Sequence, residues 1–513
     1  NTASYNTAVG KDALAANTSG ASNVAIGRNA LDANTTAGSN TAVGASAMGA
    51  NTTGDNNVAV GTETMLVNTT GANNTAVGVA ALDANTTADN NTAVGRSALG
   101  ANTTGSSNVA VGKEALLTNT TGANNTAIGK DSLRLNTTGA GNTVLGHNAL
   151  ESNTTASDNT AVGKDALKAN TTATANTAVG RSALLSATTG SYNTAMGYKA
   201  GDTITTGQSN TLMGYETGQA LTDSESNAFF GMQAGYASTT SDNNTFIGFR
   251  AGFTNTTGAN NVAVGSLTLD AATTANDNTA IGQGAMSGTT TGAGNTAIGL
   301  SALYSNTTGS NNVAIGAAAL FANTASENTA IGRYCLDANT SGGNNVGVGY
   351  NVLGANTTGG QNTAVGHTAL DANTDGTENT AMGYGALGAN TTGHSNTALG
   401  EAALDAHTTG ASNTAVGRDA LGANTTASNN TAVGLNALLV NTTGSENTCV
   451  GKSAGDAVTT GANNVLIGYD SGSDALTTVS TGSNNIVLGN NSTSVFETKV
   501  SLTVGSDERD KTD

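Results

Sequence analysis

The chain repeats, with a period of 17 residues, the segment Asn6-Thr7-Ala8-Val9-Gly10-Lys11-Asp12-Ala13-Leu14-Ala15-Ala16-Asn17-Thr18-Ser19-Gly20-Ala21-Ser22. The glycine that closes Asn-Thr-Ala-Val-Gly recurs at this spacing up to Gly316 and again from Gly332 to Gly468. One residue is lost between these two runs, and four are gained before the last copy at Gly489. The array has 29 copies, and self-similarity at a fixed period is typical of solenoids and other repeat proteins.

The repeat itself predicts its secondary structure when its positions are numbered 1 to 17 from Asn6. Repeat positions 2 to 4 hold Thr or Val, then mostly Ala, then an aliphatic residue, which predicts a short strand. Gly at position 5 and Asn-Thr-Thr-Gly at positions 12 to 15 predict two bends. So much glycine excludes two packed helices per repeat. We therefore expect an all-β protein, a parallel β-solenoid with one coil per repeat.

The array defines the domain organisation that we expect. Residues 1–489 form the solenoid, which would span about 140 Å at a spacing of about 4.8 Å per coil. We expect residues 490–505 to form a short β stem and residues 506–513 to form a polar segment. Because Asn1-Thr2-Ala3-Ser4-Tyr5 starts in the middle of a repeat, we expect the array to continue upstream.

In a stacked solenoid each repeat position becomes a ladder of like residues. Asn at position 1 can bond along the ladder and to the backbone, and Gly at position 5 indicates a positive φ or a close backbone contact. The first members of these two ladders are Asn6, Gly10, Asn23, Gly27, Asn40 and Gly44. Positions 4 and 9 are the consistently bulky apolar positions, so we expect them to fill the interior.

Repeat position 3 alternates with position 4 along the strand, so we expect it to face outward. It is Ala in most copies and never charged. An outward column of small or apolar residues usually marks an interface. The pattern therefore predicts a homo-oligomer packed along its length.

Composition excludes several classes of partner. The net charge is −18, the wrong sign for a phosphate-binding surface, so we expect no nucleic-acid partner. No apolar run approaches the roughly 20 residues that span a bilayer, and no leader precedes Asn1, so we expect a soluble chain without a membrane span or export signal of its own.

The residue types that usually form catalytic or metal sites are scattered along the sequence. The four histidines, at 147, 367, 394 and 407, occupy different repeat positions, and no Cys-x-x-Cys or His-x-x-x-His motif occurs. Cys335 and Cys449 lie seven coils apart, too far for a disulfide within one chain, which leaves Ala-like fillers or a cross-chain bond at Cys449. We expect no metal site, no cofactor and no substrate site.

Two features leave alternatives open. Tyr198, Tyr215 and Phe249 occupy position 6 in coils whose position 9 is Gly, so the rings either cover the corner that Leu usually fills or form a patch that stacks on a sugar. The sequence Asn-Thr-Thr or Asn-Thr-Ser on the second bend is either turn chemistry or a glycan acceptor, on Asn or on the adjacent Thr. Candidate acceptor asparagines are Asn17, Asn34, Asn51, Asn68 and Asn102.

The strand motif resembles that of the head repeats of trimeric autotransporter adhesins. Asn23-Val24-Ala25-Ile26-Gly27, Asn108-Val109-Ala110-Val111-Gly112 and Asn312-Val313-Ala314-Ile315-Gly316 carry the likeness, and the match covers about residues 6–489. That family folds as a left-handed parallel β-roll with three chains side by side. The resemblance therefore implies a left-handed coil and a trimer.

The C-terminal segment is similar to the start of the self-cleaving intramolecular chaperone of phage tail fibres and spikes. The matching residues are Ser506-Asp507-Glu508-Arg509-Asp510-Lys511-Thr512-Asp513. In that family a Ser and the Lys five residues later cut the chain next to the Ser after assembly. The resemblance implies these roles for Ser506 and Lys511 in a longer precursor; otherwise the segment is a polar tail.

Taken together, the repeats predict a non-enzymatic structural subunit of an extracellular fibre: a phage tail fibre, a surface adhesin or a secreted filament. Its expected location is extracellular, at a cell surface or on a virion. Expected partners are further copies of itself, as a trimer or an end-to-end filament, and a glycan or protein on a host surface. The alternative is an ice-binding or glycan-binding solenoid, with Thr18, Thr35 and Thr52 as a candidate ice-binding ladder.

Overall fold

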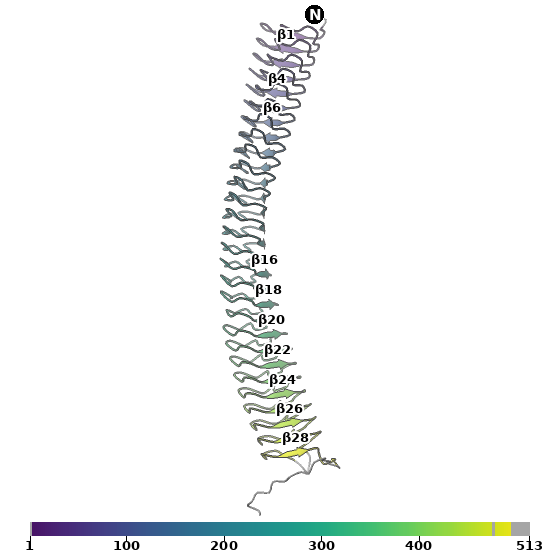
Figure 1. The fold of residues 1–513 in the computed structure, drawn as a ribbon, viewed down its shortest axis with the longest axis vertical. Coiled ribbons are helices and arrows are strands. Elements are labelled where there is room, and N and C mark those ends of the chain that lie inside the picture. Colours follow the sequence, from purple (N-terminus) through teal and green to yellow (C-terminus); the bar gives the residue numbers. More distant parts are fainter. Residues whose placement is uncertain (1–2, 474–477, 494–513) are drawn as a thin grey trace, which may run out of the picture. The chain divides into compact units, whose positions relative to one another are not determined.

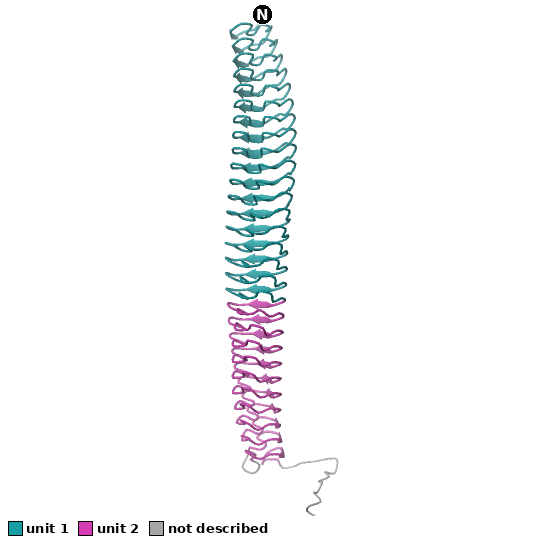
Figure 2. Cartoon of the chain, turned by 90° about the vertical axis from the view of Figure 1, so that its left-hand side faces the viewer, with its two compact units in different colours: residues 1–310 teal, residues 311–513 magenta. Residues whose placement is uncertain are grey.

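The computed structural model describes residues 3–473 and 478–493, which fall into two compact units, 1–310 and 311–513 (Figure 2). Each unit is a parallel β-solenoid with one coil per repeat, which confirms the predicted fold class and period. No helix occurs among the described residues. Residues 490–493, the described start of the expected β stem, form no strand, while Ser506 and Lys511 lie outside the described residues.

Every strand covers repeat positions 2 to 4 of one coil, as the sequence predicts (Figure 1). The strands of the first unit are β1 (Thr7–Val9), β2 (Val24–Ile26), β3 (Thr41–Val43), β4 (Val58–Val60), β5 (Thr75–Val77), β6 (Thr92–Val94), β7 (Val109–Val111), β8 (Thr126–Ile128), β9 (Thr143–Leu145), β10 (Thr160–Val162), β11 (Thr177–Val179), β12 (Thr194–Met196), β13 (Thr211–Met213), β14 (Ala228–Phe230), β15 (Thr245–Ile247), β16 (Val262–Val264), β17 (Thr279–Ile281) and β18 (Thr296–Ile298). The strands of the second unit are β19 (Val313–Ile315), β20 (Thr329–Ile331), β21 (Val346–Val348), β22 (Thr363–Val365), β23 (Thr380–Met382), β24 (Thr397–Leu399), β25 (Thr414–Val416), β26 (Thr431–Val433), β27 (Thr448–Val450), β28 (Val465–Ile467) and β29 (Ile486–Leu488).

Within each unit, successive strands pair in parallel and without a register shift, so like residues stack. In the first unit Ala8 lies opposite Ala25. In the second unit the register survives the coil that lacks one residue, because Val313 still lies opposite Thr329. The lost residue is taken up in the second bend, where the Asn323 side-chain amide donates to the carbonyl of Ala325, two residues on instead of the usual three.

The interior of the coil is formed by repeat positions 1, 3, 8, 9, 12 and 15. Position 3 is inside, since Ala25 and Ala42 are fully buried, whereas position 4 faces outward, with Ile26 40% exposed. The expectation that position 4 fills the interior and position 3 faces outward is therefore wrong. The physical reason lies in position 1: its buried Asn shares a strand face with position 3, and alternation sends positions 2 and 4 to the other face.

Two further expectations about the core are confirmed. Position 9 fills the interior, as shown by Leu31 and Met48, both fully buried. Position 5 requires glycine twice over: Gly10 has a φ of 131°, and a Cβ built on it would lie 2.6 Å from the carbonyl oxygen of Gly27 in the next coil.

Candidate binding surfaces

The outer face of the strands is an uncharged surface built from two repeat positions. Position 2 is Thr or Val with few exceptions, and position 4 is Val, Ile, Leu, Met or Phe in all 29 strands. The position 4 side chains are partly or largely exposed, for example 40% in Ile26 and 37% in Val60. An outward apolar column of this length is unusual for the surface of a monomer.

This geometry corrects the predicted interface. Position 3, proposed from the sequence as the packing surface between chains, is buried inside the coil, as Ala178 illustrates. A residue inside the coil cannot contact a second chain. The outward uncharged column does exist, but positions 2 and 4 form it.

The Asn ladder at position 1 is internal and hydrogen-bonded at nearly every coil, with Nδ2 of Asn91 as an exception. The Asn40 side-chain amide donates to the carbonyl of Gly54 at 2.9 Å, and the backbone N–H of Asn57 donates to Asn40 Oδ1 at 2.8 Å. Such an Asn thus joins two coils and also bridges its own coil, which accounts for its constancy in the sequence.

The candidate glycan acceptors also lie inside. Asn34, Asn51, Asn68 and Asn102 are fully buried, and the amide of Asn51 donates to Asn34 Oδ1 and to the carbonyl of Gly54. Asn17, in the first described coil, is half-buried and donates to the carbonyl of Gly20. The folded coil leaves no space for an N-linked glycan on the four fully buried side chains, so this interpretation is corrected for them. The exposed residue of the bend is the Thr or Ser at position 14, such as Thr36.

The Thr ladder proposed for ice binding is engaged with the backbone. Thr35 Oγ1 donates to the carbonyl of Thr52 at 3.2 Å, and Thr52 Oγ1 donates to the carbonyl of Thr69 at 3.0 Å. Hydroxyl groups held in this way stabilise the bend and have less capacity to order water.

The expected aromatic patch is only partly contiguous. Tyr198 and Tyr215 stack with ring centroids 5.3 Å apart, but Met232 separates them from Phe249, which is 42% exposed. The rings do not replace the missing Leu of position 9. That space is filled from position 3 instead, by Leu212, Phe229 and Phe246, all buried.

A second aromatic column, in the second unit, was missed by the sequence reasoning. Tyr350, His367 and Tyr384 occupy position 6 of three successive coils, and their rings stack with centroids 5.1 and 5.3 Å apart. Their spacing of 17 residues was the signal that could have revealed them.

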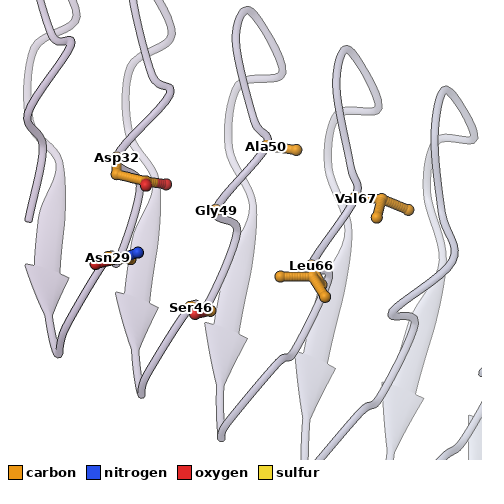
Figure 3. Close-up of a pocket in the computed structure, with 7 residues that line it drawn as sticks. All are labelled: Asn29, Asp32, Ser46, Gly49, Ala50, Leu66 and Val67. Atoms are coloured by element: carbon orange, nitrogen blue, oxygen red, sulfur yellow. The ribbon is translucent and has the colours of Figure 1, made fainter.

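Shallow hollows recur where position 10 is Gly. Figure 3 shows one of about 310 Å³, in which Gly49 leaves space between Asp32 of the preceding coil and Leu66 of the next. The same order of Asp, Gly and Leu recurs at Asp83, Gly100 and Leu117, and again at Asp405, Gly422 and Leu439. Burial raises the pKa of most position 10 carboxyl groups; these residues are Asp83, Asp202, Asp270, Asp337, Asp371 and Asp405.

His407 is the one histidine inside a coil, where it replaces the Asn of position 12. Its ring is fully buried, Nε2 lies 2.9 Å from the carbonyl oxygen of Gly410, and burial lowers its pKa. Nδ1 is buried without a hydrogen-bond partner, as is Oδ1 of Asn390 in the preceding coil. The substitution therefore interrupts the Asn ladder.

The remaining candidate groups form no site. Among residues 3–473 and 478–493, no three His, Cys, Asp or Glu side chains lie close enough together to hold a metal ion. Cys335 and Cys449 are buried free thiols. The same residues contain no helix that could cross a membrane.

No protein-family model matches the chain, and no curated protein matches it in sequence.

Proposed function

We propose that the chain is a structural subunit of an extracellular fibre on a virion or a cell surface. The observation that carries this proposal is the bonding between coils. Each coil donates backbone hydrogen bonds to the next at points spread around its perimeter, for example from Thr7 to Asn23, from Leu14 to Ala30 and from Thr18 to Thr35. Bonds on all sides resist bending in every direction, so each solenoid unit has the architecture of a stiff structural rod.

The fibre forms by side-by-side packing of copies through the outer strand face. A second copy is the partner whose side chains repeat with the same rise, and neither position 2 nor position 4 carries a charge that packing would have to desolvate. With strands about 4.8 Å apart and a face about 10 Å wide, each coil offers about 50 Å². The 18 coils of the first unit offer about 900 Å², enough for a stable interface at roughly 800 Å² per partner.

Sedimentation of matched variants tests this assembly. Asp in place of Val111 and Ile128, both at position 4, should increase the monomer fraction, because two carboxylates would be buried without partners at the interface. The control is Ser97→Asp, at a position where Asp131 and Asp165 occur naturally. Equal monomer fractions for the two proteins would contradict packing through the strand face.

The stoichiometry and the hand are proposed from the adhesin resemblance: three copies around a common axis and a left-handed coil. Electron micrographs of the purified protein would test the first of these. Cross-sections that show two chains, or isolated single chains at all concentrations, would argue against the trimer.

The tail resemblance supports a maturation step. In a longer precursor, the chain is cut next to Ser506 after assembly, with Lys511 lowering the cost of deprotonating the serine. Mass spectrometry of the C-terminus tests this step, since Ser506→Ala and Lys511→Ala should both leave the fibre joined to its C-terminal extension. A wild-type chain that runs intact past Lys511 would contradict it.

Ice binding is the second candidate function, and the strand face favours it more than the Thr18 ladder does. Thr and Val at position 2 stand beside an aliphatic column in regular parallel register, for example Thr41 and Val43 beside Val58 and Val60. Such a flat, uncharged lattice could order water. A thermal-hysteresis measurement separates the two functions, because a fibre that packs through this face has no such activity.

A further inference from the structure

The aromatic column of the second unit ends in an open ring face. Tyr384 stacks on His367 on one side, and the coil that follows carries Glu401 at the same repeat position. No other ring stacks on Tyr384 within the described residues. Its side chain is 62% exposed. Tyr384 therefore presents one aromatic face that the rod itself does not use.

A hollow of about 450 Å³ lies beside this ring. Its volume falls within the range of small-molecule sites. Its lining includes Asp371, Tyr384, Gly385, Gly388 and Asp405.

Two carboxylates point into the hollow over the same glycine. Oδ1 of Asp405 and Oδ1 of Asp371 lie 3.0 and 3.6 Å from the point that a Cβ on Gly388 would occupy. Neither carboxylate forms an ion pair with any described residue. Burial is the main cause that raises the pKa of both groups. The two carboxylates are thus partly desolvated acceptors outside any ion pair, and Asp371 also interacts with the charge of His367.

We propose that this hollow binds a hexopyranose unit of a glycan. The C–H face of the sugar packs on the open face of Tyr384, and hydroxyl groups on its edge donate to Asp371 and Asp405. Hydrogen bonds to charged acceptors are among the stronger ones, and an aromatic face supplies the apolar contact and the orientation. The absence of side chains at Gly385 and Gly388 makes room for the ring.

This arrangement distinguishes the hollow from the equivalent ones elsewhere. The hollow at Gly49 has one carboxylate, from Asp32, and no aromatic residue in its lining. The hollow at Gly422 also has two carboxylates, from Asp405 and Asp419, but it is lined by Leu439 and Val440 in place of a ring. The ring and the convergent carboxylates occur together at Gly388, so binding should be confined to this place among the hollows described.

Saturation-transfer NMR on the full chain tests the proposal. The probes are methyl β-D-glucopyranoside, methyl β-D-galactopyranoside and, as a competing class of ligand, 1,4-diaminobutane. At least one glycoside should receive saturation, most strongly at the protons of one ring face. The signal should fall at least tenfold in Tyr384→Ala and in Gly388→Leu.

The chain supplies its own controls for these variants. Leu occupies position 10 naturally at Leu66, Leu117 and Leu439, so Gly388→Leu fills the hollow with a side chain that the coil accommodates. Gly49→Leu makes the same change in the first unit and should leave the glycoside signal unchanged. The proposal is overturned if neither glycoside receives saturation, if the signal survives in Gly388→Leu, or if 1,4-diaminobutane binds and the glycosides do not.

Discussion

The ring of Phe229 lies where the side chain of residue 235 would begin, and residue 235 is glycine. Most coils place Ala at repeat position 3 and Leu or Met at position 9, whereas this coil reverses the sizes. Phe246 and Gly252 repeat the exchange in the next coil, and the two phenylalanine rings stack with centroids 4.8 Å apart. In these two coils the interior volume that position 9 usually supplies therefore comes from position 3.

This exchange predicts a compensating pair of substitutions. Gly235→Leu alone should destabilise the protein by about 1–3 kcal/mol or more, because the new side chain meets the Phe229 ring. Phe229→Ala alone should cost about 3–5 kcal/mol through the cavity it leaves. The double variant restores the usual combination and should regain most of the loss. Urea denaturation of the four proteins gives the coupling energy, and additive effects would contradict the shared space.

The bend at position 5 predicts that substitutions of two adjacent residues differ sharply in how much they destabilise the protein. Gly163 has a φ of 132°, and a Cβ on it would lie 2.5 Å from the carbonyl oxygen of Gly180. Gly163→Val should therefore cost more than about 2 kcal/mol, since it strains both the backbone and the junction with the next coil. Lys164→Ala, an exposed change next to it, should stay within about 0.5 kcal/mol. Thermal unfolding followed by circular dichroism compares the two, and equal losses would argue against a closed bend.

Because of His407, we expect the stability of the fold to decrease as the pH falls. Its folded pKa is lowered by burial, so the unfolded chain takes up a proton first as the pH falls. Stability from this residue is present above the unfolded pKa of about 6.5 and is lost as the pH drops below it. His407→Asn should remove this dependence. It should also stabilise the protein by about 1–3 kcal/mol at neutral pH, because Oδ1 of Asn390 gains a donor. Unfolding measured from pH 7.5 to 5 tests both effects, and identical pH profiles for the two proteins would contradict this role.

The two cysteines predict slow thiol chemistry. Burial raises the pKa of Cys335 and of Cys449 to about 12, so almost no thiolate exists at neutral pH. Both should react with a thiol reagent only as the coils open, at rates that rise with urea concentration. Fast labelling of the native protein would place the thiols outside the coil.

The strand positions and the period could be predicted because each depends on residues adjacent in sequence. The direction of the side chains could not be predicted from residue size, since Ala at position 3 looks like a surface residue and Val at position 4 like a core residue. The stronger signal was the constant Asn of position 1, which shares a face with position 3. A polar residue without exceptions, such as Asn40, indicated a buried hydrogen-bonding role.

Part of the candidate glycan site could likewise be predicted from the sequence, and part of it could not. The column of Tyr350, His367 and Tyr384 follows directly from the 17-residue spacing. The hollow over Gly388 does not, because it depends on how carboxylates from the two neighbouring coils, Asp371 and Asp405, turn toward a missing side chain. Distances between coils decide that geometry, and no single repeat contains them.

The short coil that begins at Asn312 shows that the junctions between coils are interchangeable, since it keeps the strand register with one residue fewer. Most coils offer their neighbours the same set of donors and acceptors, so a gene that gains or loses one such repeat unit encodes a protein with no new kind of junction. Unequal recombination between neighbouring copies then changes the length of the protein in steps of one coil. Alleles should therefore differ by whole multiples of the repeat, and their products should differ in reach while keeping the same cross-section.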